Sequence, residues 1–162
     1  MGKINILIDG GSGTGKTTLA AELLRLGYNS VDSDTLCYNG DPETGEPVAV
    51  KTHETWIWDK QEIIKLLEND QDVTFICGGS RNRDQFIDRF DYVFELMVDE
   101  ETLKHRIATR PGNGWGKNPE ELELILSIHR NDPKRPKGAI EIDSTKPLDL
   151  VVNEVLGIVG VL

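Results

Sequence analysis

Short apolar runs alternate along the chain with longer segments that carry leucine, isoleucine or valine at helical spacing. The first run, residues 4–8, is rich in isoleucine and is typical of a buried parallel strand. Leu19, Leu23 and Leu26 follow at the spacing of one helical face, and a glycine ends the pattern. A first helix is therefore predicted over residues 16–26.

The same alternation continues to the end of the chain. The other expected strands cover residues 30–31, 73–77, 92–98 and 139–142. The other expected helices cover residues 60–68, 100–109, 119–130 and 147–159. Strands that alternate with helices predict right-handed βαβ units and a parallel sheet. Two segments with glycine and proline, 37–55 and 111–118, are long enough to be functional loops.

Composition narrows the class of protein. The 162 residues are the length of one ordinary domain, and 38% hydrophobic with 28% charged residues is typical of a globular protein. No apolar run approaches the roughly 18–20 residues of a membrane span, and no signal peptide is expected before the first strand. Two cysteines cannot form a disulfide framework or a four-cysteine zinc site, and the three histidines lack metal-ligand spacing. A single domain over residues 1–162 and a cytoplasmic location are expected, with cysteines and histidines at packing or surface positions.

The charge distribution points to a local anionic ligand. A net charge of −10 argues against general attraction to nucleic acid, although it leaves a nucleic-acid partner open. Residues 103–137 nevertheless carry eight basic groups against four acidic ones. These basic residues are Lys104, Arg106, Arg110, Lys117, Arg130, Lys134, Arg135 and Lys137.

A phosphate-binding pattern stands between the first strand and the first helix. Gly10-Gly11-Ser12-Gly13-Thr14-Gly15-Lys16-Thr17 fits G-x-x-x-x-G-K-[ST]. Its glycines let successive amides face phosphate oxygens at a helix N-terminus. Lys16 is expected to reach the β- and γ-phosphates of ATP, and the Thr17 hydroxyl to bind Mg²⁺. The candidate ATP-binding residues are Gly11, Ser12, Gly13, Thr14, Gly15, Lys16, Thr17 and Thr18.

Other P-loop classes fit the chain poorly. The guanine element [NT]-K-x-D of GTPases is approached by Thr145-Lys146-Pro147-Leu148-Asp149, which has one residue too many. A transporter signature is lacking, and 162 residues are few for an AAA machine with its extra helical domain. A small kinase is therefore expected.

The second strand ends in Val31-Asp32-Ser33-Asp34, where a parallel sheet faces its ligand. Two carboxylates at i and i+2 of an extended segment point to the same side. One can hold magnesium through water, and the other can accept the hydrogen of an acceptor hydroxyl. A helix N-cap within a polar turn is the structural alternative.

The P-loop, the D-S-D segment and Cys77-Gly78-Gly79 together resemble the shikimate- and gluconate-kinase branch of small P-loop kinases. The resemblance implies a three-layer α/β P-loop NTPase fold with a five-stranded parallel sheet in the order 2-3-1-4-5 and a lid insertion. It implies that Asp32 assists the metal and that Asp34, Gly78 and Gly79 bind a hydroxylated substrate. The arginine with which that branch binds a substrate carboxylate is missing from residues 37–58, so shikimate itself is not expected.

Other candidates for the acceptor side lie nearby. Arg81 and Arg83 follow the glycine pair and either face the substrate or begin a solvated helix. Tyr38, Trp56 and Trp58 either stack on a flat acceptor or pack in the core. Arg81 and Trp56 are included among the substrate-binding candidates.

The segment from Leu103 to Arg110 resembles the L-x-x-R-I-x-x-R helix that enters the lid of adenylate-kinase-like enzymes. Arg106 and Arg110 share one helical face. The resemblance implies that Arg106 lies near adenine or the α-phosphate, that Arg110 lies near the transferring phosphate, and that the lid covers about residues 110–132. A basic solvated surface is the alternative, and Arg130 is a weaker candidate for a phosphate contact.

These patterns predict an ATP- and Mg²⁺-dependent kinase that phosphorylates a hydroxyl of a small nucleoside- or sugar-like acceptor. Lys16, Asp34, Arg106 and Arg110 are the expected catalytic residues, and Thr17 and Asp32 the expected metal ligands. Three alternatives are a nucleoside-monophosphate kinase, a kinase acting on a hydroxylated base or nucleotide in DNA, and a non-catalytic nucleotide-binding regulator. The patterns define neither the acceptor nor an oligomeric state.

Overall fold

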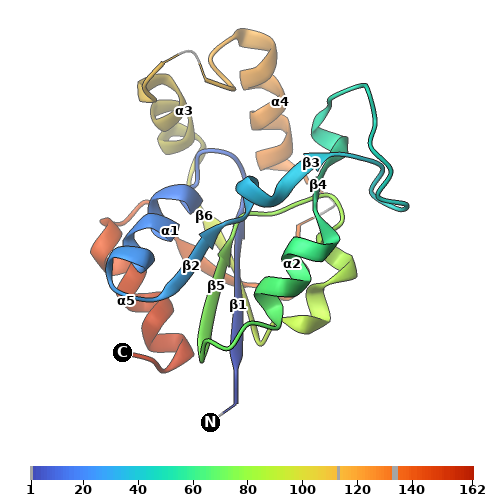
Figure 1. Cartoon of the computed structure of the whole chain (residues 1–162). Helices are drawn as coiled ribbons and strands as arrows, with labels where there is room; N and C mark the ends of the chain where they lie inside the picture. The colour runs from blue at the N-terminus through green and yellow to red at the C-terminus, as the bar shows by residue number, and fades with distance from the viewer. Residues whose placement is uncertain (1, 113, 133–134) are drawn as a thin grey trace.

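A five-stranded parallel sheet forms the centre of the molecule (Figure 1). The computed structural model describes residues 2–112, 114–132 and 135–162, so Met1, Asn113 of the predicted lid loop and Lys134 of the basic segment lie outside the described residues. The sheet strands are β1 (Ile4–Gly10), β2 (Asn29–Asp32), β5 (Val73–Cys77), β6 (Tyr92–Met97) and β7 (Ile140–Asp143). Their order is β2-β5-β1-β6-β7, which confirms the predicted fold class and strand order.

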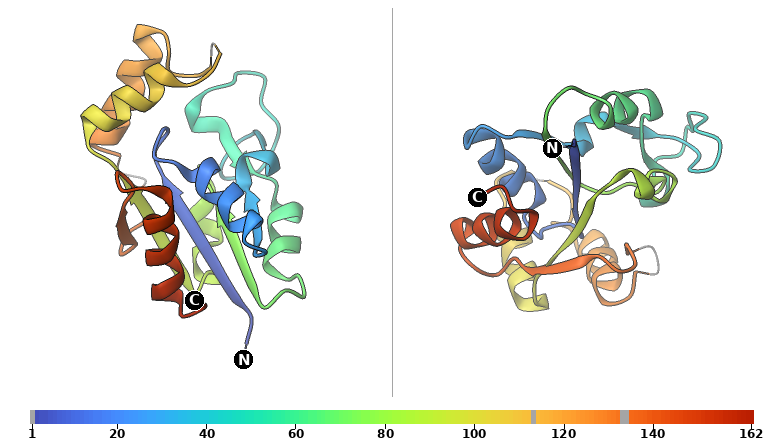
Figure 2. Two further views of the ribbon diagram at one scale, coloured as in Figure 1. Left: turned by 90° about the vertical axis from the view of Figure 1, so that its left-hand side faces the viewer. Right: turned by 90° about the horizontal axis from the view of Figure 1, so that it is seen from below.

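Helices cover both faces of the sheet (Figures 1 and 2). Because side chains alternate along a strand, Ile6 and Ile8 face one side and Leu7 the other. Helices α1 (Lys16–Arg25) and α5 (Leu148–Val159) pack against the isoleucine side. Helix α2 (Lys60–Leu67) packs against the Leu7 side, together with Trp58 and Phe86. The central strands are buried on both faces, as their continuous apolar runs predict.

Two helices stand above the carboxyl edge of the sheet (Figure 1). These are α3 (Glu100–Thr109) and α4 (Pro119–Arg130), and both have the predicted bounds. Asp99 caps α3 by accepting a hydrogen bond from the Thr102 amide, and Asn118 caps α4 with a proline directly after it. The pair has its own apolar cluster: Val98, Leu103, Ile107, Ile125 and Leu126.

The segment 37–55 departs from its prediction as a loop. It begins with strand β3 (Cys37–Asn39), which pairs antiparallel with β4 (Trp56–Trp58). Short 3-10 helices lie at Ser33–Leu36, His53–Thr55, Arg83–Gln85 and Ile87–Arg89. Three-residue strands are too short to display a two-residue period, and their pairing joins residues far apart in the sequence. Among the described residues, no helix has the length and apolar character needed to cross a membrane.

Candidate active site

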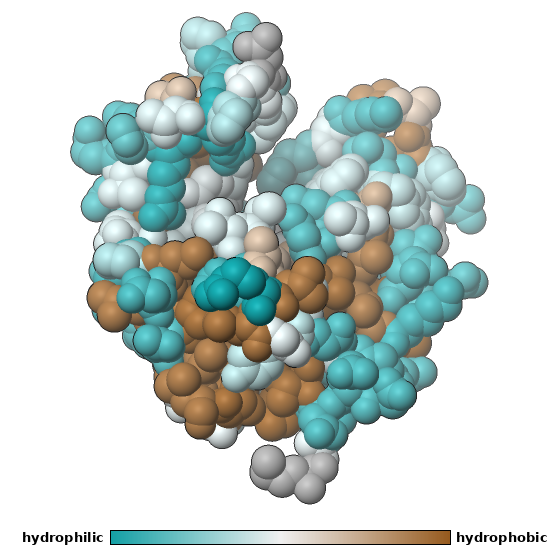
Figure 3. All heavy atoms as spheres, turned by 60° about the vertical axis from the view of Figure 1, so that its left-hand side comes forward, coloured by the Kyte–Doolittle hydropathy of each residue, from teal (hydrophilic) through white to brown (hydrophobic). Residues whose placement is uncertain are grey.

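A cavity of about 860 Å³ opens at the carboxyl edge of the sheet. In Figure 3 the surface is hollowed between the lobe formed by α3 and α4 and the lobe formed by the β3–β4 insertion. Three predicted site residues, Thr14, Asp32 and Gly78, do not line it. The others do: Gly11, Ser12, Gly13, Gly15, Lys16, Thr17, Thr18, Asp34, Trp56, Gly79, Arg81, Arg106 and Arg110. The fold thus gathers candidates from five separate segments.

The predicted phosphate loop has the geometry of an anion cradle. Gly13 and Gly15 adopt φ values of 81° and 103°, which residues with a side chain rarely adopt. Thr14 turns inward, and its hydroxyl donates to the Gly11 carbonyl at 2.8 Å, which closes the loop from behind. No side chain of the described residues caps the N-terminus of α1, so its first amides remain available to an anion.

Lys16, Thr17 and Asp32 lie at the mouth of this loop. The Lys16 ammonium donates to the Gly10 carbonyl, and the Thr17 hydroxyl donates to Asp32 Oδ2 at 3.0 Å. A hydroxyl and a carboxylate are oxygen donors of the kind that Mg²⁺ prefers, with phosphate and water completing its shell. Among the described residues, no cluster of three or more His, Cys, Asp or Glu could hold a metal ion by itself. The donor set therefore fits a magnesium ion shared with a phosphate ligand.

The D-S-D segment is not extended as predicted. Asp32 ends β2, and its Oδ1 accepts the amide of Asp34 at 3.1 Å, so that it caps the 3-10 helix Ser33–Leu36. The N-cap alternative is therefore correct for one oxygen of Asp32, while the other oxygen meets Thr17. Asp34 instead reaches the cavity from the first turn of that helix.

The two tryptophans of β4 have different environments. Trp56 lines the cavity, and its indole Nε1 donates to Asp34 Oδ1 at 3.2 Å. Trp58 is fully buried, with ring centroids 6.0 Å from Phe86 and 6.3 Å from Phe90, so it is a packing residue. Tyr38 does not line this cavity, and its hydroxyl donates to the Gly45 carbonyl. Stacking on an acceptor therefore remains a prediction for Trp56 alone.

Close contacts account for the glycine pair after β5. A Cβ atom on Gly79 would lie 2.4 Å from Asp9 Oδ1, and one on Gly78 would lie 2.4 Å from Ser33 Oγ. Gly78 also has φ of 129°. The missing side chains therefore leave room for Asp9 and Ser33, and of the two glycines only Gly79 lines the cavity.

Arg106 and Arg110 extend from α3 onto the phosphate loop. Arg106 donates to the carbonyls of Thr14 at 3.1 Å and Ser144 at 2.5 Å. Arg110 donates to Ser12 Oγ at 3.2 Å and thus reaches the other side of the loop. Arg130 does not line the cavity and pairs with Glu100 and Glu123, which matches the alternative of a basic helix surface.

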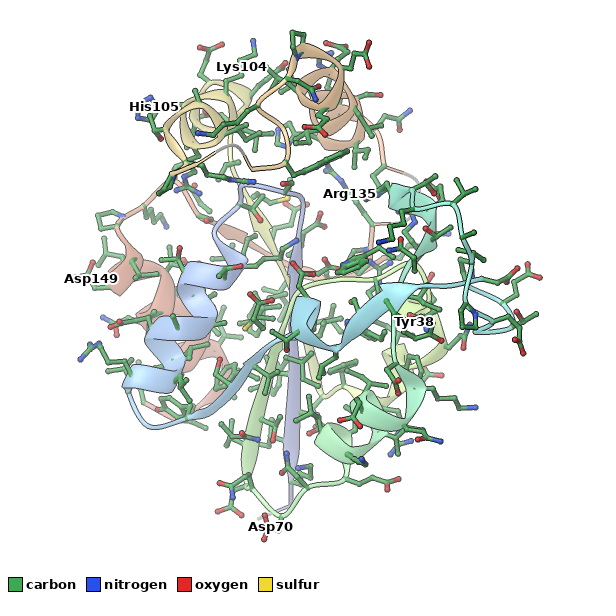
Figure 4. All side chains as sticks on the ribbon, turned by 45° about the horizontal axis from the view of Figure 1, so that its top comes forward. Tyr38, Asp70, Lys104, His105, Arg135 and Asp149 are labelled. Atoms are coloured by element: carbon green, nitrogen blue, oxygen red, sulfur yellow. The ribbon has the colours of Figure 1, made fainter. Side chains whose placement is uncertain are left out.

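Four charged residues form a wall of the cavity that begins beside the phosphate loop. Of these, only Arg83 is a candidate from the sequence to face the substrate, whereas Asp9, Glu95 and Arg135 have no individual role predicted there. Asp9 and Arg83 make an ion pair of 2.6 Å with side chains about 8% exposed. Glu95 lies beside Asp9 in register, and Arg135 approaches it at 3.6 Å. Figure 4 shows Arg135 between α4 and the insertion. Burial, with Asp9 nearby, raises the pKa of Glu95 although Arg135 opposes this effect. The sequence signal that could have identified Asp9 and Glu95 as site residues is a single acidic residue inside an otherwise apolar strand.

Two histidines predicted at surface or packing positions also line the cavity. His53 Nε2 lies 3.2 Å from Arg81 Nη1. Desolvation and the neighbouring arginines lower the pKa values of His53 and His129, so both imidazoles are mainly neutral at pH 7. Cys77 is a buried packing residue and Cys37 is partly buried, as expected, and burial raises the pKa of each thiol to about 12.

Several solved structures share this fold over nearly the whole chain. A shikimate kinase from Bacteroides thetaiotaomicron is 16% identical, with a TM-score of 0.68 and coverage of 97% of this chain and 98% of that one. A sugar kinase from Janibacter is 20% identical, with a TM-score of 0.63 and coverage of 98% and 95%. A gluconokinase from Sinorhizobium meliloti is 22% identical, with a TM-score of 0.59 and coverage of 95% and 90%. At these identities the likeness concerns the fold.

The sequence itself also matches a family. No curated protein is significantly similar to the chain. The family described as "AAA domain" matches residues 6–125, which include the phosphate loop, the D-S-D segment and α3. The match concerns the P-loop domain alone. That the protein lacks the extra helical domain of an AAA machine stays a prediction from its length. The chain therefore belongs to the AAA domain family of P-loop proteins, whose phosphate loop implies nucleotide binding.

Proposed function

We propose that the protein is a kinase that transfers the γ-phosphate of ATP, with Mg²⁺, to a hydroxyl group of a small nucleoside- or sugar-like acceptor. One observation carries this proposal: a single cavity is lined by Lys16 of the phosphate loop, Arg106 and Arg110 above it, and Asp34 on the adjoining wall. These are the parts that phosphoryl transfer needs, namely a phosphate cradle, cations near the transferring group and a base near the acceptor. The folds of the neighbouring kinases support the same activity.

Each residue has a defined part in the proposed reaction. The loop amides and Lys16 bind the β- and γ-phosphates, and Thr17 and Asp32 hold Mg²⁺, which would neutralise charge on the phosphate oxygens. The acceptor oxygen attacks the γ-phosphorus, the bond to the β–γ bridging oxygen breaks, and ADP leaves. Asp34 accepts the proton of the acceptor hydroxyl, and Trp56 Nε1 keeps that carboxylate in place.

The alternatives are less well supported. A nucleoside-monophosphate kinase needs arginines for the acceptor phosphate, but Arg81 and Arg83 are both paired with carboxylates. A kinase that acts on a base in DNA would have to bind a polyanion although its own net charge is −10. Its turnover would fall steeply as the salt concentration rises. A nucleotide-binding regulator would hydrolyse ATP slowly, whatever acceptor is present.

The test is a coupled ADP-release assay across nucleosides, nucleotides, sugars and hydroxy acids. Lys16→Ala should lower transfer by roughly 10²–10³-fold or more, because a preorganised donor to the phosphates is lost. Lys65→Ala is the matched control, since Lys65 lies exposed on α2 and pairs with Glu62. Both variants should have the circular dichroism of the wild type. Full transfer by the Lys16 variant would refute the proposal.

Asp34→Asn tests the acceptor role separately. The substituted side chain keeps an oxygen for Trp56 Nε1 but cannot take a proton, so kcat should fall far more than ATP affinity. Equal losses in kcat and in ATP affinity would contradict a role toward the acceptor.

A further inference from the structure

The wall of the cavity that begins beside the phosphate loop and includes Asp34 has an unusual charge balance. We call this wall the acceptor half; its charged lining residues in the described structure are Asp9, Asp34, Glu95, Asp132 and three arginines. The arginines are Arg81, Arg83 and Arg135. The four carboxylates exceed the three guanidinium groups, and the two nearby histidines are mainly neutral at pH 7. This surface therefore offers no excess positive charge to an anion.

Each of the three arginines already has a carboxylate partner. Arg83 is paired with Asp9, and both side chains are buried. Arg135 approaches Glu95, which is 7% exposed. If either arginine turned to a ligand anion, a buried carboxylate would lose its partner, which is strongly unfavourable. These two arginines therefore stabilise buried carboxylates of the protein and are not available to bind an anionic ligand.

Arg81 is held differently. Its Nη2 donates to both carboxylate oxygens of Glu54, at 3.0 and 2.8 Å. The Glu54 side chain is 67% exposed, whereas that of Arg81 is 11% exposed. Loss of Glu54 would leave no buried carboxylate without a partner, and it would leave the guanidinium group of Arg81 at the cavity wall with its charge uncompensated. Among these three arginines, Arg81 is the one whose charge is neutralised by an exposed carboxylate, that of Glu54.

The remaining polar groups suit a ligand that donates hydrogen bonds. Ionised carboxylates only accept hydrogen bonds, and the Asp34 carboxylate in this half is exposed to the cavity. Hydroxyl groups are the neutral donors that match it. Trp56 adds an aromatic face at the same place, on which the apolar face of a sugar ring or a base can pack.

We propose that the acceptor is an electrically neutral, hydroxyl-rich molecule, and that Glu54 determines this specificity by cancelling the charge of Arg81. The proposal rests on the kinase function proposed above. Acids and phosphate monoesters are disfavoured because they meet three arginines that are already neutralised and an excess of carboxylates.

The experiment compares acceptors that differ chiefly in charge. Three pairs are suitable: sorbitol with gluconate, methyl shikimate with shikimate, and a nucleoside with its 5′-monophosphate. Transfer is followed by ADP release, and binding of the same compounds by calorimetry in the presence of a non-hydrolysable ATP analogue and Mg²⁺. In each pair that reacts or binds, the neutral member should be favoured about tenfold or more.

Glu54→Gln should shift this preference toward the anionic member about tenfold or more, because Arg81 becomes available to bind it. Glu46→Gln is the matched control, since it removes the same charge from an exposed position of the same insertion. An anionic preference in the wild type, an unchanged preference in the Glu54 variant, or tighter binding of a cationic amino sugar than of its neutral parent would overturn the proposal. So would failure of every neutral compound to bind. Absence of transfer with intact neutral binding would instead reject the kinase function alone.

Discussion

Asp9 shows how a charge is accommodated inside an apolar strand. Its side chain is only about 8% exposed, and it has two partners: Oδ2 pairs with Arg83 at 2.6 Å, and Oδ1 accepts the Gly10 amide at 2.7 Å. Arg83 also pairs with Asp84 at 3.0 Å. Because these partners hold the Asp9 side chain, it fixes the wall of the cavity directly beside the phosphate loop.

Arg83→Met should therefore destabilise the protein strongly, because it keeps the apolar stem but leaves Asp9 buried without its ion-pair partner. Loss of one partner of a buried pair typically costs about 3–5 kcal/mol, and a decrease of about 3 kcal/mol in the free energy of unfolding is expected. Arg89→Met is the control, because Arg89 and Glu68 are 45% and 62% exposed and such pairs contribute about 1 kcal/mol or less. Urea unfolding measures both, and similar losses in the two variants would contradict this interpretation.

The site residues that could be predicted from the sequence belong to motifs of residues close together along the chain, whereas those that could not be predicted are brought to the site by tertiary contacts. The phosphate loop is eight consecutive residues, and its glycines and lysine define the site without any tertiary contact. Glu95 joins this site only because β6 pairs with β1 in one register, and Arg135 only because the segment after α4 returns to the sheet. A pattern along the chain carries no information on such pairings.

At the scale of elements, a helix or strand is predicted correctly from the sequence where residues at its end mark that end. Helices α3 and α4 begin at the predicted residues because Asp99 and Asn118 cap their first turns with hydrogen bonds and Pro119 fits the first helical position. Strands β3 and β4 have three residues each and pair with one another in a two-stranded sheet, so neither is extended by a neighbour in the main sheet. The insertion nevertheless supplies Trp56 and, through its 3-10 turn, Glu54 to the cavity region.

The turn after β5 gives a prediction at this scale. Gly79→Ala places a Cβ atom 2.4 Å from Asp9 Oδ1 and 2.8 Å from Oδ2, so either the turn or the Asp9–Arg83 pair must shift. Overpacking of this kind typically costs about 1–3 kcal/mol, which corresponds to a Tm lower by several degrees. Acceptor turnover should fall as well. Gly114→Ala is the control, because no atom lies within 4 Å of its added Cβ. If neither variant lowers the Tm, the turn accommodates the added Cβ atom and the predicted clash with Asp9 is wrong.

At the scale of the whole molecule, the α3–α4 pair is built as a separate unit above the site. Its apolar cluster is distinct from those of the two sheet faces (Figures 1 and 2). Polar contacts from Arg106 and Arg110 join it to the phosphate loop. A unit with its own core and a polar contact with the loop can change position as one body when a nucleotide replaces those polar partners.

Trp115 can report this movement, because it lies between the two helices, lines the cavity and is 47% exposed. Its carbonyl accepts a hydrogen bond from Arg110 at 3.3 Å, so it is linked to the arginine expected nearest the transferring phosphate. A non-hydrolysable ATP analogue with Mg²⁺ should shift the tryptophan emission to shorter wavelength, since closure removes water from the indole. The shift should persist in Trp56→Phe and disappear in Trp115→Phe, while fully buried Trp58 contributes a constant signal in all forms. A shift that survives only in Trp115→Phe would place the change at the acceptor wall and contradict closure of the α3–α4 pair.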